Sequence, residues 1–345
     1  MNRERFFYFI VKSKKHLYQQ HETHVIILFV TFRNQATEDL SVKRLSLTFG
    51  IHLTHHQREN FMEENCSSRT AQRVAMRRAA HQILDNPKIF DDPLALRVLG
   101  LEKASAQDAN QTWLEDTPLA RVLRASLAAR SRYAEDELHA AIKRGVDQYV
   151  VLGAGLDTFA CRNPYPPNAL HVFEVDHPAT QIWKRTRLEE AGIPVPLTLS
   201  FSPVDFETQT LEEGLRRTGF DANKPAFFSW LGVTMYLTGD AINATLRWVA
   251  SMPVGSGIVF DYLISPALLS PTARKVFDGL ADRVARAGEP FQTFFDPSSL
   301  KAALQEMGFG QVEDLEPEAM DARYFRGRTD GLRVGRLAHV MNARV

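Results

Sequence analysis

The fold of this chain is decided by the stretch Val150-Val151-Leu152-Gly153-Ala154-Gly155-Leu156-Asp157-Thr158. An apolar run ends there in a Gly-x-Gly turn, and a second apolar run, Leu170 to Val175, ends about twenty residues after the turn in Asp176. A strand, a glycine turn, a crossover and a second strand that ends in a carboxylate form a nucleoside-binding arrangement. We therefore predict that Gly153, Ala154 and Gly155 approach a nucleoside cofactor and that Asp176 accepts its ribose hydroxyls. A helix-capping role for Asp176 is compatible with this.

Length, charge and cysteine content limit the class of protein. The chain has 345 residues, enough for one large α/β domain with additions or for two domains. Its 41 basic and 41 acidic residues balance, so nothing favours nucleic acid or an anionic membrane as a partner. Cys66 and Cys161 lie far apart without metal-type spacing, and no apolar run approaches the roughly 20 residues that span a bilayer. We expect a cytoplasmic protein that binds neither membranes nor nucleic acids.

Residues 1–61 differ from the rest of the chain. They contain no glycine before Gly50 and show no clear helical or strand period. We expect a poorly structured extension over 1–61 and the functional domain over 62–345. Six of the eleven histidines fall in the extension, but no acids or cysteines complete a ligand frame, so we expect no metal site. Metal binding remains the alternative for these histidines, which are His16, His21, His24, His52, His55 and His56.

The functional domain is expected to consist of a helical cap over 62–146 and an α/β core over 147–345. In the cap, Ser67 or Ser68 begins a helix that ends at Leu84, and Asp116-Thr117-Pro118 begins a longer one that ends near Lys143. In the core, near-continuous apolar runs alternate with helical segments, which predicts a parallel sheet covered on both faces. The predicted strands are 148–152, 170–175, 197–201, 226–230, 257–262 and, at an antiparallel edge, 311–315 and 331–339.

Further candidate residues follow these predicted strands. Glu174 alternates with Asp176 on one strand face and is the second candidate for the ribose. Asp205 and Phe206 follow the third strand, where an acid accepts from the adenine amino group and an aromatic ring covers the base. The alternative is a loop aspartate and a core phenylalanine. Trp230 ends the fourth strand and is either a cofactor contact or a core residue.

A hydroxyl substrate would require a general base. Tyr236, just after the fourth strand, and His177, at a helix start, are the candidates. A lone histidine at a helix start is more often a cap or a surface residue.

Three motifs in order resemble bacterial S-adenosylmethionine-dependent methyltransferases of the leucine carboxyl methyltransferase-like group: 151–158, 174–178 and 230–237. The resemblance runs from about Ser67 to the C-terminus. It implies a class I methyltransferase fold, Rossmann-like, with a mostly parallel seven-stranded sheet, an antiparallel last strand and a helical N-terminal addition. It also implies S-adenosylmethionine as cofactor, with its methionine part beside Gly153 and Gly155, its ribose on Asp176 and its adenine on Asp205 and Phe206. Arg132 or Arg130 would pair with the methionine carboxylate, a task that suits a planar guanidinium.

The leading hypothesis is methyl transfer from the cofactor sulfonium to an oxygen of a small-molecule carboxylate or hydroxyl. The chain departs from the family where Leu231 replaces a frequent glutamate and Phe159 a frequent arginine. One alternative is an NAD(P)-dependent oxidoreductase, which is disfavoured because Thr158 stands where the dinucleotide fingerprint has its third glycine. The other is a cofactor-binding protein without turnover, which Leu231 keeps open.

Overall fold

The computed structural model describes residues 7–12, 25–30, 69–102, 114–205, 209–286 and 288–345, and the chain divides into two units, Met1–Asn65 and Cys66–Val345. In the first unit, β1 (Phe7–Lys12) pairs antiparallel with β2 (Val25–Val30), although we expected no strand there. Both segments are rich in aromatic and β-branched residues, which favour strands. The six histidines for which metal binding was the alternative lie outside the described residues.

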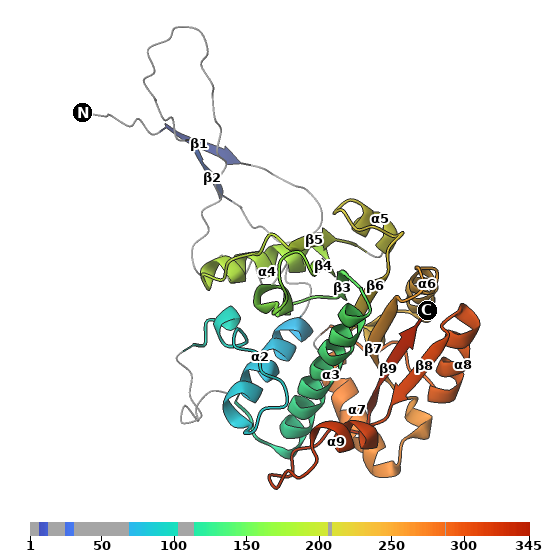
Figure 1. Cartoon of the computed structure of the whole chain (residues 1–345). Helices are drawn as coiled ribbons and strands as arrows, with labels where there is room; N and C mark the ends of the chain where they lie inside the picture. Colours follow the sequence, from blue (N-terminus) through green and yellow to red (C-terminus); the bar gives the residue numbers. More distant parts are fainter. Residues whose placement is uncertain (1–6, 13–24, 31–68, 103–113, 206–208, 287) are drawn as a thin grey trace. The chain divides into compact units, whose positions relative to one another are not determined.

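The second unit is built on a seven-stranded sheet (Figure 1). Its strands are β3 (Gln148–Leu152), β4 (His171–Asp176), β5 (Leu199–Pro203), β6 (Ala226–Trp230), β7 (Gly257–Leu263), β8 (Gln311–Leu315) and β9 (Ala338–Arg344). The strand order is β5-β4-β3-β6-β7-β9-β8, and β9 runs antiparallel to both β7 and β8 while the other pairs are parallel. The predicted class I arrangement is confirmed. The order reverses at β3, where ligands bind in open α/β sheets.

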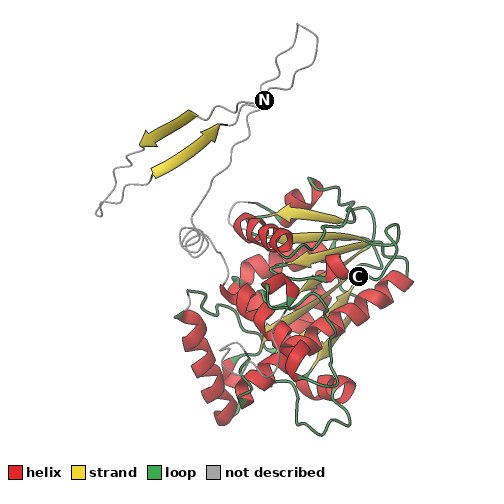
Figure 2. Ribbon diagram, turned by 90° about the vertical axis from the view of Figure 1, so that its left-hand side faces the viewer, coloured by secondary structure: helices red, strands yellow, loops and turns green. Residues whose placement is uncertain are grey.

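Alternate residues of the central strands enter two separate cores. Tyr149 and Val151 of β3 belong to one core, and Val150 and Leu152 belong to the other. The first is covered by α3 (Pro118–Lys143), against which α2 (Arg69–Leu84) packs, and by α9 (Pro317–Tyr324). The second is covered by α5 (Leu211–Arg216), α6 (Gly239–Ala250) and α8 (Pro297–Met307). Figure 2 shows the strands as a layer between helices.

The long helix α3, which belongs to the predicted helical cap, packs against the sheet at β6 and β7. The predicted start of this helix is confirmed. Thr117 accepts a hydrogen bond from the Ala120 N–H at 3.2 Å, and Pro118 occupies the first turn, where its missing N–H costs nothing. Gly145, with a φ of 96°, follows the end of the helix.

The predicted last strand over 331–339 is wrong, because β9 begins only at Ala338. Gly331 has a φ of 72°, a left-handed conformation that a strand does not contain. Two helices were also not predicted from the sequence: α7 (Pro271–Ala285) and α9. In the described part of the chain, no helix combines the length and the apolar character that crossing a membrane requires.

Candidate functional site

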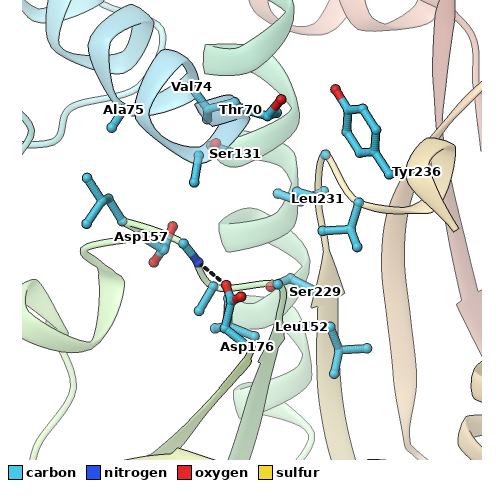
Figure 3. A pocket seen from close by; sticks show the side chains of 18 of the residues that line it. Thr70, Val74, Ala75, Ser131, Leu152, Asp157, Asp176, Ser229, Leu231 and Tyr236 are labelled. Carbon is cyan, nitrogen blue, oxygen red and sulfur yellow. Dashed lines mark hydrogen bonds between the residues drawn. The ribbon is translucent and has the colours of Figure 1, made fainter. Parts of the chain in front are cut away.

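A cavity of about 570 Å³ lies at the carboxyl ends of β3, β4 and β6 (Figure 3). Its walls come from the turn after β3, the end of β4, the segment after β6, helices α2 and α3, and residues 288–292. This volume is within the range of sites for small molecules and cofactors, about 300–1,000 Å³. The cavity therefore opens at the place where the strand order reverses, as the glycine turn predicts.

The glycine turn forms one wall of the cavity and is packed closely from both sides. Gly153 and Gly155 have φ values of 66° and 46°, in the left-handed region that favours glycine. A Cβ on Gly153 would lie 2.3 Å from Cγ2 of Val233, and a Cβ on Gly155 would lie 3.1 Å from that of Ala71. The segment after β6 and the first turns of α2 thus leave the turn no room for a side chain. Ala154 also lines the cavity.

Asp176 lies at the end of β4 and is fixed to the same turn. One carboxylate oxygen accepts from the Gly155 N–H at 2.6 Å, which is the dashed line to Asp176 in Figure 3. The other oxygen accepts from the His177 N–H at 2.7 Å. Burial raises the pKa of the Asp176 carboxyl, and the hydrogen bonds from Gly155 and His177 oppose that shift. The carboxylate is therefore held at the edge of the cavity, where it can accept from a ligand hydroxyl.

Two other acids of the cavity wall are neutralised by arginines. Asp157 lies 3.1 Å from Arg78, which also reaches Asp92 at 3.4 Å. Glu135 is paired with Arg162, whose Nε lies 3.5 Å from Asp92. Burial raises the pKa of Asp157, but the charges of Arg78, Lys184 and Arg162 and the hydrogen bond from the Phe159 N–H together hold that pKa below its ordinary value. Because each acid is paired, this wall is suited to shaping the cavity and poorly suited to removing protons.

Arg130 brings a guanidinium into the cavity from α3. Its Nη1 donates to the buried carboxylate of Asp261, which also accepts from the Gly232 N–H at 2.6 Å. Its buried Nε has no hydrogen-bond partner among the described residues. Buried polar groups are normally paired, so an orphaned guanidinium N–H in a cavity wall indicates a place for a ligand anion.

Arg132, the other arginine considered from the sequence, does not line this cavity. Its Nε pairs with Asp136 one turn further along α3 at 2.8 Å, and 51% of its side chain is exposed. Residues two positions apart lie on nearly opposite sides of a helix, so only one of the two arginines can face the cavity. The structure places Arg130 there.

The far end of the cavity contains two hydroxyls and a carboxylate. Tyr236 lies in a short 3₁₀ helix, η3 (Thr234–Tyr236), and lines the cavity together with Thr70 from α2. Thr70 in turn contacts Glu289. Figure 3 shows Thr70 and Tyr236 at the opposite end from Asp157 and Asp176. Sequence reasoning missed Glu289, because no local pattern marks a residue that reaches the cavity only through the fold.

Besides Arg132, three more of the residues predicted from the sequence are absent from the cavity lining: Glu174, Trp230 and His177. Glu174 pairs with Lys184 of α4 (Pro178–Glu190) at 2.6 Å, and both side chains are 1% exposed. Trp230 is also 1% exposed and packs against Phe260 in the second core. His177 is exposed and caps α4, since its Nδ1 accepts from the Ala179 N–H at 3.2 Å.

The alternation of side chains along β4 explains the position of Glu174. It faces the same side as Asp176 but lies two residues deeper in the sheet, where α4 covers it. Burial raises the pKa of Glu174 to about 7, and the charge of Lys184 opposes this shift.

The predicted adenine contacts remain predictions. Asp205 follows β5 and is not among the residues that line the cavity, and Phe206 lies outside the described residues. Of the two departures from the family, Leu231 lines the cavity, whereas Phe159 is buried edge-on against Tyr149 with ring centroids 5.0 Å apart. Across the described ranges, no group of three or more histidines, cysteines or acids is arranged to hold a metal ion.

Comparisons with known proteins relate the chain to methyltransferases. Residues 71–250 match the sequence model of a family described as leucine carboxyl methyltransferase. The Bacillus subtilis (strain 168) protein "Putative S-adenosyl-L-methionine-dependent methyltransferase YktD" is 34% identical over 312 residues, 82% of this chain and 99% of that protein. A Mycobacterium ulcerans (strain Agy99) protein named "Putative S-adenosyl-L-methionine-dependent methyltransferase" is 34% identical over 53% of this chain and 60% of its own length. The solved structure of human N-acetylserotonin methyltransferase with SAM is 14% identical over 82% of this chain and 68% of that chain, with a TM-score of 0.38, too distant to bear on the site.

Proposed function

Because this chain belongs to the leucine carboxyl methyltransferase family and is an S-adenosylmethionine-dependent methyltransferase, we propose that it methylates an oxygen atom of a small molecule, either a carboxylate or a hydroxyl. The observation that carries the proposal is the single cavity that joins the glycine turn to Tyr236, Thr70 and Glu289. Family membership favours methyl transfer over hydride transfer and over binding without turnover.

The residues at one end of the cavity fit S-adenosylmethionine. The orphaned Nε of Arg130 suits the methionine carboxylate, and the Asp176 carboxylate suits a ribose hydroxyl. Gly153 and Gly155 also line this end, and because they have no side chains the cofactor can approach their backbone closely. When bound, the cofactor supplies an electrophilic methyl group on a positively charged sulfur. We name this group, Gly153, Gly155, Asp176 and Arg130, the cofactor end.

The other end of the cavity fits an oxygen acceptor. Thr70, Tyr236 and Glu289, which we name the acceptor end, provide polar groups that can orient a small oxygen-containing molecule. Leu231 and Val233 line the wall between the two ends with apolar side chains that exclude water. Orienting reactants in this way supplies up to about 7–11 kcal/mol of a reaction barrier in favourable cases. The family description names a carboxyl group as the acceptor, which also supports transfer to oxygen.

Calorimetric titration and a turnover assay on the full chain test this proposal together. We expect S-adenosylmethionine and S-adenosylhomocysteine to bind and NAD to give no heat. With methyl-tritiated S-adenosylmethionine and a deproteinised bacterial metabolite extract, we expect label in small molecules and stoichiometric S-adenosylhomocysteine. Binding without any transfer of label, or label on nitrogen or carbon only, would contradict the proposal.

A further inference from the structure

Asp261 of β7 lies beside the arginine of the cofactor end and accepts hydrogen bonds from two elements. Nη1 of Arg130 donates to one carboxylate oxygen of Asp261, and the Gly232 N–H donates to the other at 2.6 Å. The Thr234 hydroxyl donates to the backbone carbonyl of Asp261, also at 2.6 Å. The Asp261 side chain is only 3% exposed. Asp261 is therefore bonded both to α3 and to the segment that follows β6.

Gly232 also limits the position of the same guanidinium, by close contact. Its φ is 77°, in the left-handed region that favours glycine. A Cβ on Gly232 would lie 2.7 Å from Nη2 of Arg130 and 3.4 Å from its Cζ, so the guanidinium lies directly against the Gly232 backbone. Gly232 and Arg130 line the cavity, whereas Asp261 is not among the lining residues. The guanidinium is thus bonded to Asp261 at Nη1 and bounded by Gly232 at Nη2.

These two contacts determine the direction of the remaining nitrogen of Arg130. A guanidinium is planar and its N–H groups form a rigid fork, so holding Nη1 and Nη2 also fixes the direction of the Nε–H. This Nε is the buried nitrogen that has no hydrogen-bond partner among the described residues. A free arginine side chain loses rotamer freedom when it binds a ligand, which reduces affinity. An arginine that is already held in place loses less.

We propose that Asp261 is a positioning residue of this methyltransferase, which together with Gly232 holds Arg130 ready for the carboxylate of the methionine part of the cofactor. This inference rests on the cofactor placement proposed above, and it does not depend on which oxygen is methylated. The methionine part also carries the sulfur, so a fixed carboxylate helps to fix the sulfur relative to the acceptor end. Asp261 acts only through Arg130 and does not itself contact the cofactor.

Two other roles of Asp261 would produce the same contacts. The first is purely structural, because a buried carboxylate paired with an arginine also affects the stability of the fold. The second is competition, in which Asp261 occupies Arg130 and weakens the binding of a ligand carboxylate. The three roles differ in their consequences. Loss of the Asp261 charge weakens the binding of carboxylate ligands only if Asp261 positions Arg130, weakens all ligands alike if its role is structural, and strengthens binding if it competes.

Calorimetric titration of the full chain with two ligands distinguishes these roles. The ligands are S-adenosylhomocysteine and its decarboxylated analogue, which lacks only the carboxylate. Asp261→Asn keeps the size of the side chain but has a single oxygen, so it cannot accept as Asp261 does from both Gly232 and Arg130. We expect about tenfold weaker binding of S-adenosylhomocysteine, the lower end of the range for a hydrogen bond to a charged group, and no measurable change for the analogue. Equal losses for both ligands, or unchanged or tighter binding of S-adenosylhomocysteine, would overturn the inference.

Gly232→Ala tests the same positioning without removing a charge, and it decides the question if the Asp261 variant does not fold. The matched control is Gly145→Ala, since Gly145 also has a positive φ, 96°, but nothing within 4 Å of an added Cβ. We expect Gly232→Ala to bind S-adenosylhomocysteine more weakly while its affinity for the decarboxylated analogue is kept. Gly145→Ala should bind both ligands as wild type does. Wild-type affinity for S-adenosylhomocysteine in Gly232→Ala would contradict the inference.

A double-mutant cycle then shows whether Asp261 acts through Arg130. In an Arg130→Met background, Asp261→Asn should no longer weaken the binding of S-adenosylhomocysteine, because the group that it positions is absent. A loss of the same size in both backgrounds would show that Asp261 acts by another route. Weaker binding in Arg130→Met but not in Asp261→Asn would overturn the positioning role and leave the cofactor placement intact. Wild-type affinity in Arg130→Met would contradict both.

Discussion

At the cofactor end of the cavity, the glycine turn and Asp176 come from the ends of two neighbouring strands, and Asp176 is held by hydrogen bonds from the backbone N–H groups of Gly155 and His177. Arg130 joins them from α3. At the acceptor end, Thr70, Tyr236 and Glu289 come from three distant segments, and Thr70 donates to the Glu289 carboxylate from both its N–H and its hydroxyl. The arrangement at the cofactor end therefore depends on the local geometry of the glycine turn and the end of β4. The arrangement at the acceptor end depends on contacts between segments that are far apart in the sequence.

The buried pair behind the cofactor end provides the largest expected effect. Lys184→Met leaves the Glu174 carboxylate buried without its partner, which should lower the free energy of unfolding by about 3–5 kcal/mol. Urea denaturation measures this. The double variant Lys184→Met with Glu174→Leu should recover much of the loss, because it removes both charges. A single variant as stable as wild type would show that the pair does not support the sheet.

The two arginines of α3 give the next effect. Arg130→Met should weaken the binding of S-adenosylhomocysteine by roughly tenfold to 150-fold, the value of a hydrogen bond to a charged group. Arg132→Met should leave affinity unchanged, because Arg132 pairs with Asp136 on the exposed side of the helix. Calorimetric titration of both variants measures this difference. Equal losses, or a loss in Arg132→Met only, would contradict the placement of Arg130 in the cofactor end.

The glycine turn is tested by comparing two alanine substitutions. Gly153→Ala and Gly219→Ala both force alanine into a positive φ, 66° and 90° respectively, at a cost of about 1–2 kcal/mol each. Only the new Cβ at position 153 meets a neighbour, Val233, whereas nothing lies within 4 Å at position 219. We expect the larger loss of stability, and the only loss of cofactor affinity, in Gly153→Ala. Similar behaviour of the two variants in thermal unfolding and titration would argue against close packing at the turn.

The smallest effect, counted per pH unit, is the pH dependence of stability at Glu174. Its pKa is about 7 in the folded chain against an ordinary 4.5, so between these values the folded state binds more protons than the unfolded state. The free energy of unfolding should therefore fall as pH rises through this window, by about 1 kcal/mol per pH unit. Glu174→Gln should remove this slope in urea denaturation at several pH values. An identical slope in both proteins would assign it to other groups.

The cofactor end was largely predictable because its signals are local. The apolar run before Gly153, the glycines themselves and the acid that ends the next strand follow one another along the sequence, and the two strands pair directly. The choice between Arg130 and Arg132 was not predictable, because it depends on the rotation of α3 about its axis. The positions of Glu174 and Trp230 were also not predictable. Strand alternation predicts the face of the sheet on which each side chain lies, but not whether the rest of the fold buries that side chain.

The acceptor end was only partly predictable. Tyr236 follows a strand whose carboxyl end faces the cavity, and this position marked it from the sequence. Glu289 follows α7 in a segment without strand or helix period, so only the tertiary structure brings it to Thr70. The late start of β9 was also missed, because the left-handed conformation of Gly331 cannot be read from a run that otherwise resembles a strand.

The central claim is that the cavity at the glycine turn binds S-adenosylmethionine through Asp176. Its most direct test is calorimetric titration of the full chain and of Asp176→Ala and Asp176→Asn, with Glu306→Ala, an exposed acid of α8, as the control. We predict that both Asp176 variants, if folded by circular dichroism, bind S-adenosylmethionine at least about tenfold more weakly, and that the control is unchanged. Wild-type affinity in both Asp176 variants would contradict the account.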